Sequence, residues 1–296
     1  MNSKYDVIII GGSYAGLSAA MSLGRSLRKT LIIDSGQPCN APTPHSHNFL
    51  TQDGVAPAEI AETGLKQVLK YDTVSLVKDT AISAVKTEVG FEIVTESGHN
   101  YYASKLIFAT GIKDLLPHFP GFKECWGISA IHCPYCHGYE FKNKKTALYA
   151  DGDKAMHLSG LIKNLTEDLT ILTSGKSHLT LEQKSKLESM GIKLIEETIE
   201  RIEHEKGFLS SIVFKDGRQE YFTALYAALG FQQHSDLPVA LGCILNEQGY
   251  IQVDVMQKTS IDGVFACGDN NSMMRSVANA VAQGNMAGAM VNKELC

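Results

Sequence analysis

Two cysteines separated by two residues, Cys133 and Cys136, form the part of this sequence with the clearest chemistry. Such a pair can close a small disulfide ring and reopen as a dithiol, and C-x-x-C is also half of many zinc sites. Zinc needs two further ligands at comparable spacing, and no second C-x-x-C or H-x-x-x-H follows. His132 and His137 flank the pair, which keeps a metal as the lesser alternative. The sequence therefore predicts a redox couple and no metal.

Pro134, directly after the first cysteine, predicts the start of a helix. Proline has a fixed φ and no backbone N–H, which suits the first helical position. A helix N-terminus stabilises a thiolate, so Cys133 is expected to attack well.

A strand–turn–helix–strand pattern opens the chain. The apolar run 7–10 predicts a buried parallel strand, and the glycine-rich segment 11–16 follows at once. Apolar residues at helical spacing come next, and a second apolar strand, 30–33, ends on Asp34. This order is typical of the βαβ dinucleotide-binding unit.

The special residues of this unit each have a physical role. Gly11 makes the tight turn, and Gly16 lets the helix pack closely on the strand. The helix N-terminus faces the pyrophosphate, while Asp34 accepts hydrogen bonds from the ribose. Ser13 stands where G-x-G-x-x-G has its middle glycine, which narrows the room for the pyrophosphate without closing it.

The segment after Asp34 carries four prolines and predicts a loop, whose His45 and His47 either face a cofactor ring or lie at the surface. An amphipathic helix is predicted over 59–70. The alternation of period two in 74–104 predicts a small antiparallel layer before a parallel strand over 105–111.

The second half of the chain repeats this architecture imperfectly. The predicted elements are a strand over 145–150, a helix through 165, and strands at 169–172, 193–195 and 209–214. The segment 226–230 also echoes 108–111, so a second Rossmann-like domain is predicted.

The tail is predicted to return to the first domain. It holds a strand and turn at 249–254, a strand over 261–269 and a helix rich in glycine and alanine over 276–291. We therefore predict an α/β fold of two Rossmann-like, three-layer dinucleotide-binding domains, the second inserted in the first. Residues 1–118 and 247–296 form the first domain, and residues 119–246 form the second, which carries the cysteine pair.

The composition indicates an ordinary globular protein. Of its 296 residues, 44% are hydrophobic and 20% are charged, and the net charge of −5 favours neither nucleic acid nor an anionic membrane as partner. A basic leader and a long apolar segment are both missing, so neither a secretion signal nor a membrane span is expected. Seven cysteines are too few for a disulfide scaffold, which indicates a reducing cytoplasm. Cys39, Cys125, Cys243 and Cys267 are expected to be packing thiols.

Together these motifs resemble the low-molecular-weight thioredoxin reductase family of flavoproteins, over nearly the whole chain. The resemblance rests on the order of 11–16 with Asp34, 109–111, the cysteine pair, 229–230 and 263–269. It implies that FAD binds the first domain and NADPH the second. It also implies that Cys136 lies against the flavin while Cys133 exchanges with the substrate disulfide.

The resemblance further implies that Asp269 holds the ribityl or pyrophosphate region, and that the backbone near Ser276 and Val277 faces the N1 and O2 edge of the flavin. The residues expected to bind FAD are Gly11, Ser13, Tyr14, Ala15, Gly16, Asp34, Ser35, His45, Asn48, Thr110, Gly111, Gly268, Asp269, Ser276 and Val277.

The chain departs from the family at two places. His137 stands where the family usually has an acidic residue. Imidazole titrates near neutrality, so His137 can move the proton that thiol chemistry requires. The alternative is that His137 only caps the helix or packs. The variant motif is similar to that of flavin-dependent dithiol oxidases. The second departure is 150–155, where Asp151 and Asp153 bring negative charge to the expected pyrophosphate position, and the segment 173–178 has no arginine.

The predicted function is thus an FAD-dependent disulfide oxidoreductase of thioredoxin reductase type, with catalytic residues Cys133, Cys136 and His137, that uses NADPH poorly. Its substrate is expected to be a thioredoxin-like protein or a small dithiol, with a separate electron-donor protein as a further partner. A cytoplasmic homodimer is expected. The alternatives are a dithiol oxidase that uses oxygen and, from another class, a non-enzymatic flavin redox sensor.

Overall fold

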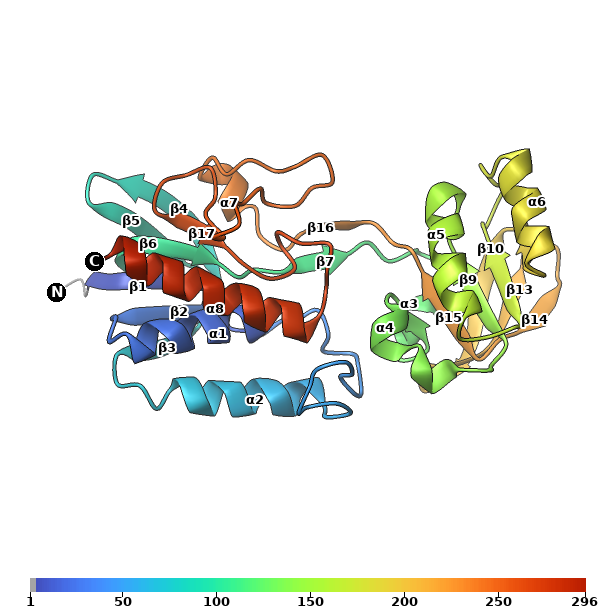
Figure 1. The fold of residues 1–296 in the computed structure, drawn as a ribbon, viewed down its shortest axis with the longest axis horizontal. Helices are drawn as coiled ribbons and strands as arrows, with labels where there is room; N and C mark the ends of the chain where they lie inside the picture. The colour runs from blue at the N-terminus through green and yellow to red at the C-terminus, as the bar shows by residue number, and fades with distance from the viewer. Residues whose placement is uncertain (1–3) are drawn as a thin grey trace. The chain divides into compact units, whose positions relative to one another are not determined.

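The computed structural model describes residues 4–296 and separates them into two compact units. The first comprises the described residues up to Ala41 with Phe49–Lys113 and Phe231–Cys296, and the second comprises Pro42–Asn48 and Asp114–Gly230. Each unit holds its own parallel sheet, which confirms the α/β fold with a second Rossmann-like domain inserted in the first. Strands β7 (Ile112–Asp114) and β16 (Phe231–Gln233) pair where the chain passes from one unit to the other (Figure 1).

The first unit is built on parallel strands in the order β3-β2-β1-β6-β17. Their bounds are β1 (Lys4–Ile10), β2 (Thr30–Asp34), β3 (Val74–Lys78), β6 (Asn100–Phe108) and β17 (Val264–Ala266). The chain leaves β1 toward β2 and later returns to β6 on the other side, so the strand order reverses between β1 and β6. Ligands of such sheets bind beyond the carboxyl ends of the strands at this reversal, beside the turn after Ile10.

Two sequence predictions in this unit need correction. β4 (Ala81–Thr87) and β5 (Gly90–Thr95) do form an antiparallel extension of β6, but 74–78 runs parallel to β2 because it returns from helix α2 (Pro57–Val68) as a crossover. The strand predicted over 249–254 is reduced to isolated bridges. The carboxylate of Asp254 accepts hydrogen bonds from the backbone of Met256 and Lys258, which turns the chain there.

Helices α1 (Tyr14–Arg25) and α8 (Val277–Glu294) lie side by side on one face of the sheet (Figure 1). Glycine makes this contact possible. A Cβ at Gly284 would collide with the carbonyl oxygen of Ala15, and one at Gly288 would lie 2.6 Å from that of Ala19. The small-residue helix predicted over 276–291 is therefore a close-packing helix, and its N-terminus is held in a fixed place.

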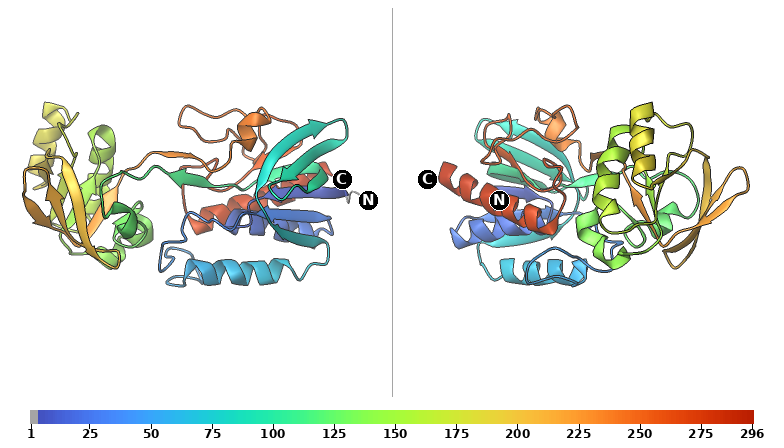
Figure 2. Two further views of the ribbon diagram at one scale, coloured as in Figure 1. Left: turned by 180° about the vertical axis from the view of Figure 1, so that it is seen from behind. Right: turned by 45° about the vertical axis from the view of Figure 1, so that its right-hand side comes forward.

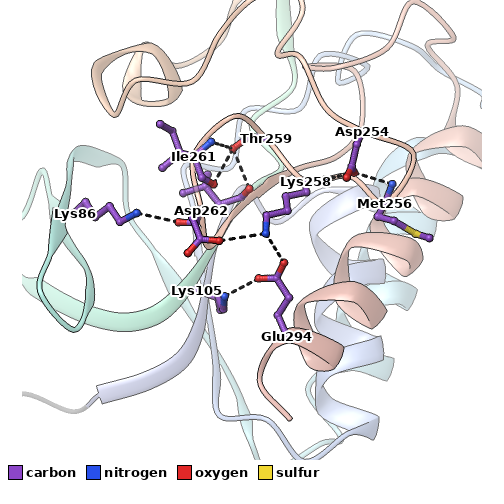
Figure 3. Close-up of polar contacts among 10 residues, drawn as sticks. Lys86, Lys105, Asp254, Met256, Lys258, Thr259, Ile261, Asp262 and Glu294 are labelled. Atoms are coloured by element: carbon purple, nitrogen blue, oxygen red, sulfur yellow. Dashed lines mark hydrogen bonds and ion pairs between the residues drawn. The ribbon is translucent and has the colours of Figure 1, made fainter.

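The C-terminal end of α8 is held by charges. Glu294 accepts hydrogen bonds from Lys105 on β6 (2.6 Å) and from Lys258 (2.8 Å), and Lys258 also reaches Asp262 (3.2 Å) (Figure 3). Burial acts to raise the pKa of Glu294, but the two lysines prevail and hold it below its usual range. The carboxylate therefore stabilises the fold above the pH at which it titrates in the unfolded chain.

Glu294→Gln is expected to lower the free energy of unfolding by about 1 kcal/mol at pH 7, the size of a partly exposed ion-pair network. The pKa of Glu294 is lower in the folded than in the unfolded protein. The difference in free energy of unfolding between wild type and variant should therefore be complete above the unfolded pKa and vanish as pH falls through the folded pKa. Denaturant unfolding of both proteins at pH 7 and at pH 3 measures this. An equal difference at the two pH values would contradict it.

The second unit contains a parallel sheet in the order β11-β10-β9-β15-β8. Its strands are β8 (Ala130–Ile131), β9 (Thr146–Tyr149), β10 (Leu169–Leu172), β11 (Lys193–Ile195) and β15 (Ala224–Ala227), with helices α3 (Phe122–Cys125), α5 (Gly152–Lys163) and α6 (Leu181–Ser189). β12 (Ile199–Glu205), β13 (Phe208–Phe214) and β14 (Gln219–Tyr221) form a separate antiparallel sheet beside it (Figure 2). The two sheets share an apolar core.

The unit boundaries differ from the expected domain limits of 118 and 247. Residues 231–246, which include helix α7 (Leu237–Ala240), lie with the first unit. Phe231 packs on Tyr250 with ring centroids 4.5 Å apart, and Gln233 donates to the carbonyls of Gly249 and Asn270. Residues 1–3 of the expected first domain lie outside the described part. Across residues 4–296, no helix has the length and apolar character needed to cross a membrane.

Candidate active site

The two cysteines lie on a single helical turn. Cys133 is the N-cap of α4 (Pro134–His137), Pro134 takes the first helical position as predicted, and the backbone N–H groups of Cys136 and His137 donate to the Cys133 carbonyl. This turn brings the two Sγ atoms to 2.8 Å from each other, a placement compatible with a disulfide between them. Because α4 has only four residues, it contributes a short dipole to Cys133.

The other cysteines differ in their surroundings. Burial raises the pKa of Cys267 to about 12 and raises those of Cys125 and Cys243, so these are packing thiols as predicted. Cys39 is exposed instead, and its Sγ lies 3.8 Å from a carboxylate oxygen of Asp269. Among the described residues, no group of three or more histidine, cysteine and acidic side chains is arranged to hold a metal ion.

His137 is placed to act as a base. Both of its ring nitrogens are shielded from solvent, and neither makes a hydrogen bond to another described residue. Burial lowers the pKa of His137, and His47 lowers it further. Glu140 and the backbone of His45 act in the opposite direction, but neither forms a hydrogen bond with the His137 ring. The ring is therefore neutral at pH 7 and can accept a proton from a thiol.

The loop that carries His45 and His47 packs in the second unit, beside the cysteine pair. The ring of His47 meets that of His137 edge-on with centroids 6.4 Å apart. Nε2 of His47 also lies 3.5 Å from Oε1 of Glu140, a residue of the 3-10 turn Tyr139–Phe141. The expected role of His45 and Asn48 in binding the cofactor remains a prediction.

Sequence reasoning missed Tyr226. This residue on β15 is buried, and its hydroxyl has no hydrogen-bond partner among the described residues. Burial raises its pKa, and the nearby Cys133 and Glu140 raise it further, so a neutral phenol lies close to the redox pair. The only indication in the sequence was that Tyr226 is the first residue of the segment 226–230, which resembles 108–111.

The turn between β1 and α1 in the first unit has the form of a cofactor cradle. Gly11 has a φ of +106°, and a Cβ there would collide with the carbonyl oxygen of Ala109. A Cβ at Gly16 would collide with the carbonyl oxygen of Gly11, so both positions require glycine. Asp34 accepts a 2.8 Å hydrogen bond from the backbone of Gly12, which ties the turn to the end of β2. Ser13 is the N-cap of α1.

Further predicted residues line the same sheet edge. The hydroxyl of Tyr14 donates to the Pro57 carbonyl (2.9 Å), and burial raises its pKa. Ser35 is exposed directly after β2. Gly111, after Thr110, has a φ of +65°, and Ala15 lies where Gly268 and Gly284 approach α1.

Two residues that sequence reasoning missed hold this edge together. Asn270 is fully buried and donates to the Phe108 carbonyl (2.9 Å) and to the Thr110 hydroxyl (3.3 Å). Gln283 on α8 accepts from the backbone of Gly268 (2.7 Å). The position of Asn270 directly after Gly268 and Asp269 was the available signal.

The N-terminus of α8 completes the cradle. Ser276 is its N-cap and accepts from the backbone of Asn279 (3.1 Å), and Val277 is the first helical residue. Asp269 lies 4.0 Å from the guanidinium of Arg275. A glycine turn, two helix N-termini and the carboxylates of Asp34 and Asp269 along one sheet edge fit the pyrophosphate and ribose of FAD.

The corresponding turn of the second unit carries an anion of its own. Asp151 is the N-cap of α5; its carboxylate accepts from the backbone of Gly152 (2.7 Å) and of His178 (3.0 Å), and lies 2.6 Å from the His178 ring. Burial acts to raise the pKa of Asp151, but these contacts lower it, so the group is ionised at pH 7. Gln183 likewise holds Asp153 (2.8 Å).

Comparisons with known proteins agree with this geometry. The family model for pyridine nucleotide-disulphide oxidoreductases matches residues 5–284. The chain is 33% identical to the thioredoxin reductase tcpT of Claviceps purpurea and 30% identical to the thioredoxin reductase sirT of Leptosphaeria maculans; each match covers 98% of this chain and 94% of the relative. The crystal structure of an oxidoreductase from Agrobacterium tumefaciens, 36% identical, superimposes with a TM-score of 0.93 over 99% of both chains.

Proposed function

The chain belongs to the pyridine nucleotide-disulphide oxidoreductase family as a thioredoxin reductase-like FAD enzyme that acts on sulfur groups. We propose that it exchanges electrons between the flavin, the Cys133–Cys136 pair and a thiol or disulfide substrate. We further propose that it does not use NADPH efficiently. The observation that carries the last point is the Asp151 carboxylate at the N-terminus of α5. The pyrophosphate of NADPH would need the backbone N–H groups at the start of α5, but the ionised Asp151 carboxylate already lies there.

The residues of the second unit can carry out the sulfur chemistry. A substrate thiolate attacks Sγ of Cys133 in the oxidised pair, the bond to Cys136 breaks, and Cys136 leaves as a thiolate. A second substrate thiol then displaces Cys133, so a substrate disulfide forms while the pair gains two electrons. His137 accepts the proton of an attacking thiol. FAD supplies a two-electron acceptor or donor for the pair when it is bound.

Two substrate classes fit this chemistry. The names of the relatives suggest a thioredoxin-like protein, which would call for a separate electron-donor protein. A small dithiol oxidised at the expense of oxygen is favoured by Asp151, since electrons that do not come from NADPH can enter from the thiols of the substrate itself. Tyr135 and Tyr139 are 68% and 69% exposed beside the pair and offer an aromatic surface to either. We place this activity in the cytoplasm, in a homodimer.

The decisive test mixes oxidised holoenzyme with NADPH or NADH under nitrogen in a stopped-flow instrument. Sub-millimolar nicotinamide should leave the flavin absorbance unchanged for seconds, whereas dithiothreitol should bleach it promptly. Asp151→Asn should tighten NADPH binding by about fivefold, the effect of removing one partly exposed charge worth about 1 kcal/mol. Glu182→Gln, on α6, is the matched charge control. Fast bleaching of the wild type by NADPH would reject the proposal, and oxygen uptake with a dithiol would identify the oxidase.

His137→Ala is expected to slow thiol turnover by about a hundredfold, the usual size of a general-base contribution. The exposed His157, on α5, provides the control His157→Gln. Steady-state consumption of dithiothreitol measures both. A loss of less than about threefold, under 1 kcal/mol of barrier, would assign His137 to packing.

A further inference from the structure

His47 lies between the proposed base and a carboxylate. Its side chain is 21% exposed, and it meets the His137 ring edge-on at 6.4 Å while its Nε2 lies 3.5 Å from Oε1 of Glu140. The segment 42–48 that carries it is held in the second unit, where Pro42 and Thr43 pack on the backbone of Gly127. The three side chains thus form a cluster beside the cysteine turn, in which both His47 and Glu140 act on the pKa of His137.

We propose that His47, held by Glu140, is a positioning residue that keeps His137 unprotonated and therefore ready to take the proton of an attacking thiol. This inference deepens the proposed function and rests on it. His47, His137 and Glu140 all belong to the second unit.

The charges of this cluster explain how His47 helps to keep His137 unprotonated. Two imidazoles at this separation repel each other when both are protonated, so the first proton lowers the affinity for the second. Glu140 lies beside His47, while both ring nitrogens of His137 are buried, so burial penalises the charged form of His137. A charge on His47 therefore lowers the pKa of His137, against the opposing effect of Glu140.

The remaining titratable groups around His137 do not reverse this assignment. His45 belongs to the same segment, and its ring lies 6.4 Å from that of His47. Cys133 and Cys136 belong to the turn of His137 itself, and their thiolates favour its protonation only after the pair has been reduced. Tyr226, on β15, is a neutral phenol because its pKa is raised by burial.

The proton step then balances simply. The substrate S–H bond breaks, its proton joins one ring nitrogen of neutral His137, and the sulfur keeps the electron pair with which it attacks Cys133. The disulfide breaks, and its electron pair stays on Cys136. His137 afterwards returns its proton to the Cys136 thiolate or to solvent, so protons and electrons are conserved.

Turnover requires neutral His137, so its acid limb reports the pKa of this ring. Without a charge at position 47, the pKa of His137 should rise toward its ordinary value, and the acid limb should move to higher pH.

The experiment compares holoenzyme variants by two readouts. His47→Gln removes the charge, and His47→Phe removes it while keeping an aromatic ring against His137, so the second variant tests charge separately from packing. His157→Gln is the control. The readouts are the pH profile of dithiothreitol turnover and the titration of the His137 ring signal by NMR after histidine-selective labelling.

Both His47 variants should move the acid limb and the His137 midpoint upward together, with turnover at pH 6 reduced by about two- to threefold and turnover at pH 8 within about twofold of wild type. His157→Gln should move neither. An unshifted His137 midpoint in either folded His47 variant would overturn the inference. If wild type consumes no dithiol, the proposed function fails, but the NMR titration still decides whether His47 governs His137.

Discussion

Serine in place of Cys136 should reduce thiol turnover by at least about a thousandfold while Cys133 still forms mixed disulfides. The two sulfur atoms lie 2.8 Å apart on one helical turn, and a hydroxyl cannot close the ring that stores two electrons. The Cys133 thiolate can still attack a disulfide substrate and release one substrate thiolate, but the mixed disulfide that forms would have no neighbouring thiolate to resolve it. Cys133→Ser should be equally inactive, because the remaining thiol has no partner on its turn.

Trapping of a substrate mixed disulfide by mass spectrometry distinguishes the two variants. Cys136→Ser should trap a disulfide substrate through Cys133, and Cys133→Ser should not. A long-wavelength charge-transfer band from the Cys136 thiolate to oxidised flavin should appear only in Cys133→Ser, if Cys136 is the sulfur next to the flavin. Cys296→Ser, an exposed cysteine of the first unit, is the control and should retain full turnover. Substrate trapped by Cys133→Ser instead would reverse the two roles.

Gly11→Val should abolish FAD binding, with an affinity loss of at least about a thousandfold. The backbone of Gly11 has a φ of +106°, which β-branched residues do not adopt without strain. Its Cβ would also collide with the Ala109 carbonyl oxygen and so force apart the ends of β1 and β6. The cradle would lose its turn at the position where the pyrophosphate approaches the backbone.

Gly98→Val separates these two causes. Gly98 has a φ of +83°, but nothing lies within 4 Å of where its Cβ would stand, so it shares the backbone strain without the collision. Purified Gly98→Val should remain yellow, whereas Gly11→Val should be colourless and stay so after FAD is added, with circular dichroism confirming that both are folded. A yellow Gly11→Val protein would refute the assignment of the cradle.

Local patterns in the sequence were enough to identify the main parts of this protein. The run from Val7 to Asp34 predicts strand, turn, helix and strand because apolar periodicity and glycine requirements act over a few residues. Pro134 predicts the turn that brings the two cysteines together for the same reason. Asp151 could be recognised as an anion at a helix N-terminus, since an N-cap and its helix are adjacent in the chain.

Tertiary structure alone decided which distant groups meet. His47 and His137 are ninety residues apart in the chain, and a proline-rich loop places them together, which no periodicity encodes. Asp151 is joined to His178, and Asn270 to the Phe108 carbonyl, only after the parallel strands have aligned. The direction of 74–78 was likewise set by the crossover through α2. Such contacts depend on the path of the whole chain, because a side chain's type determines what it can bind but not which partner the fold brings to it.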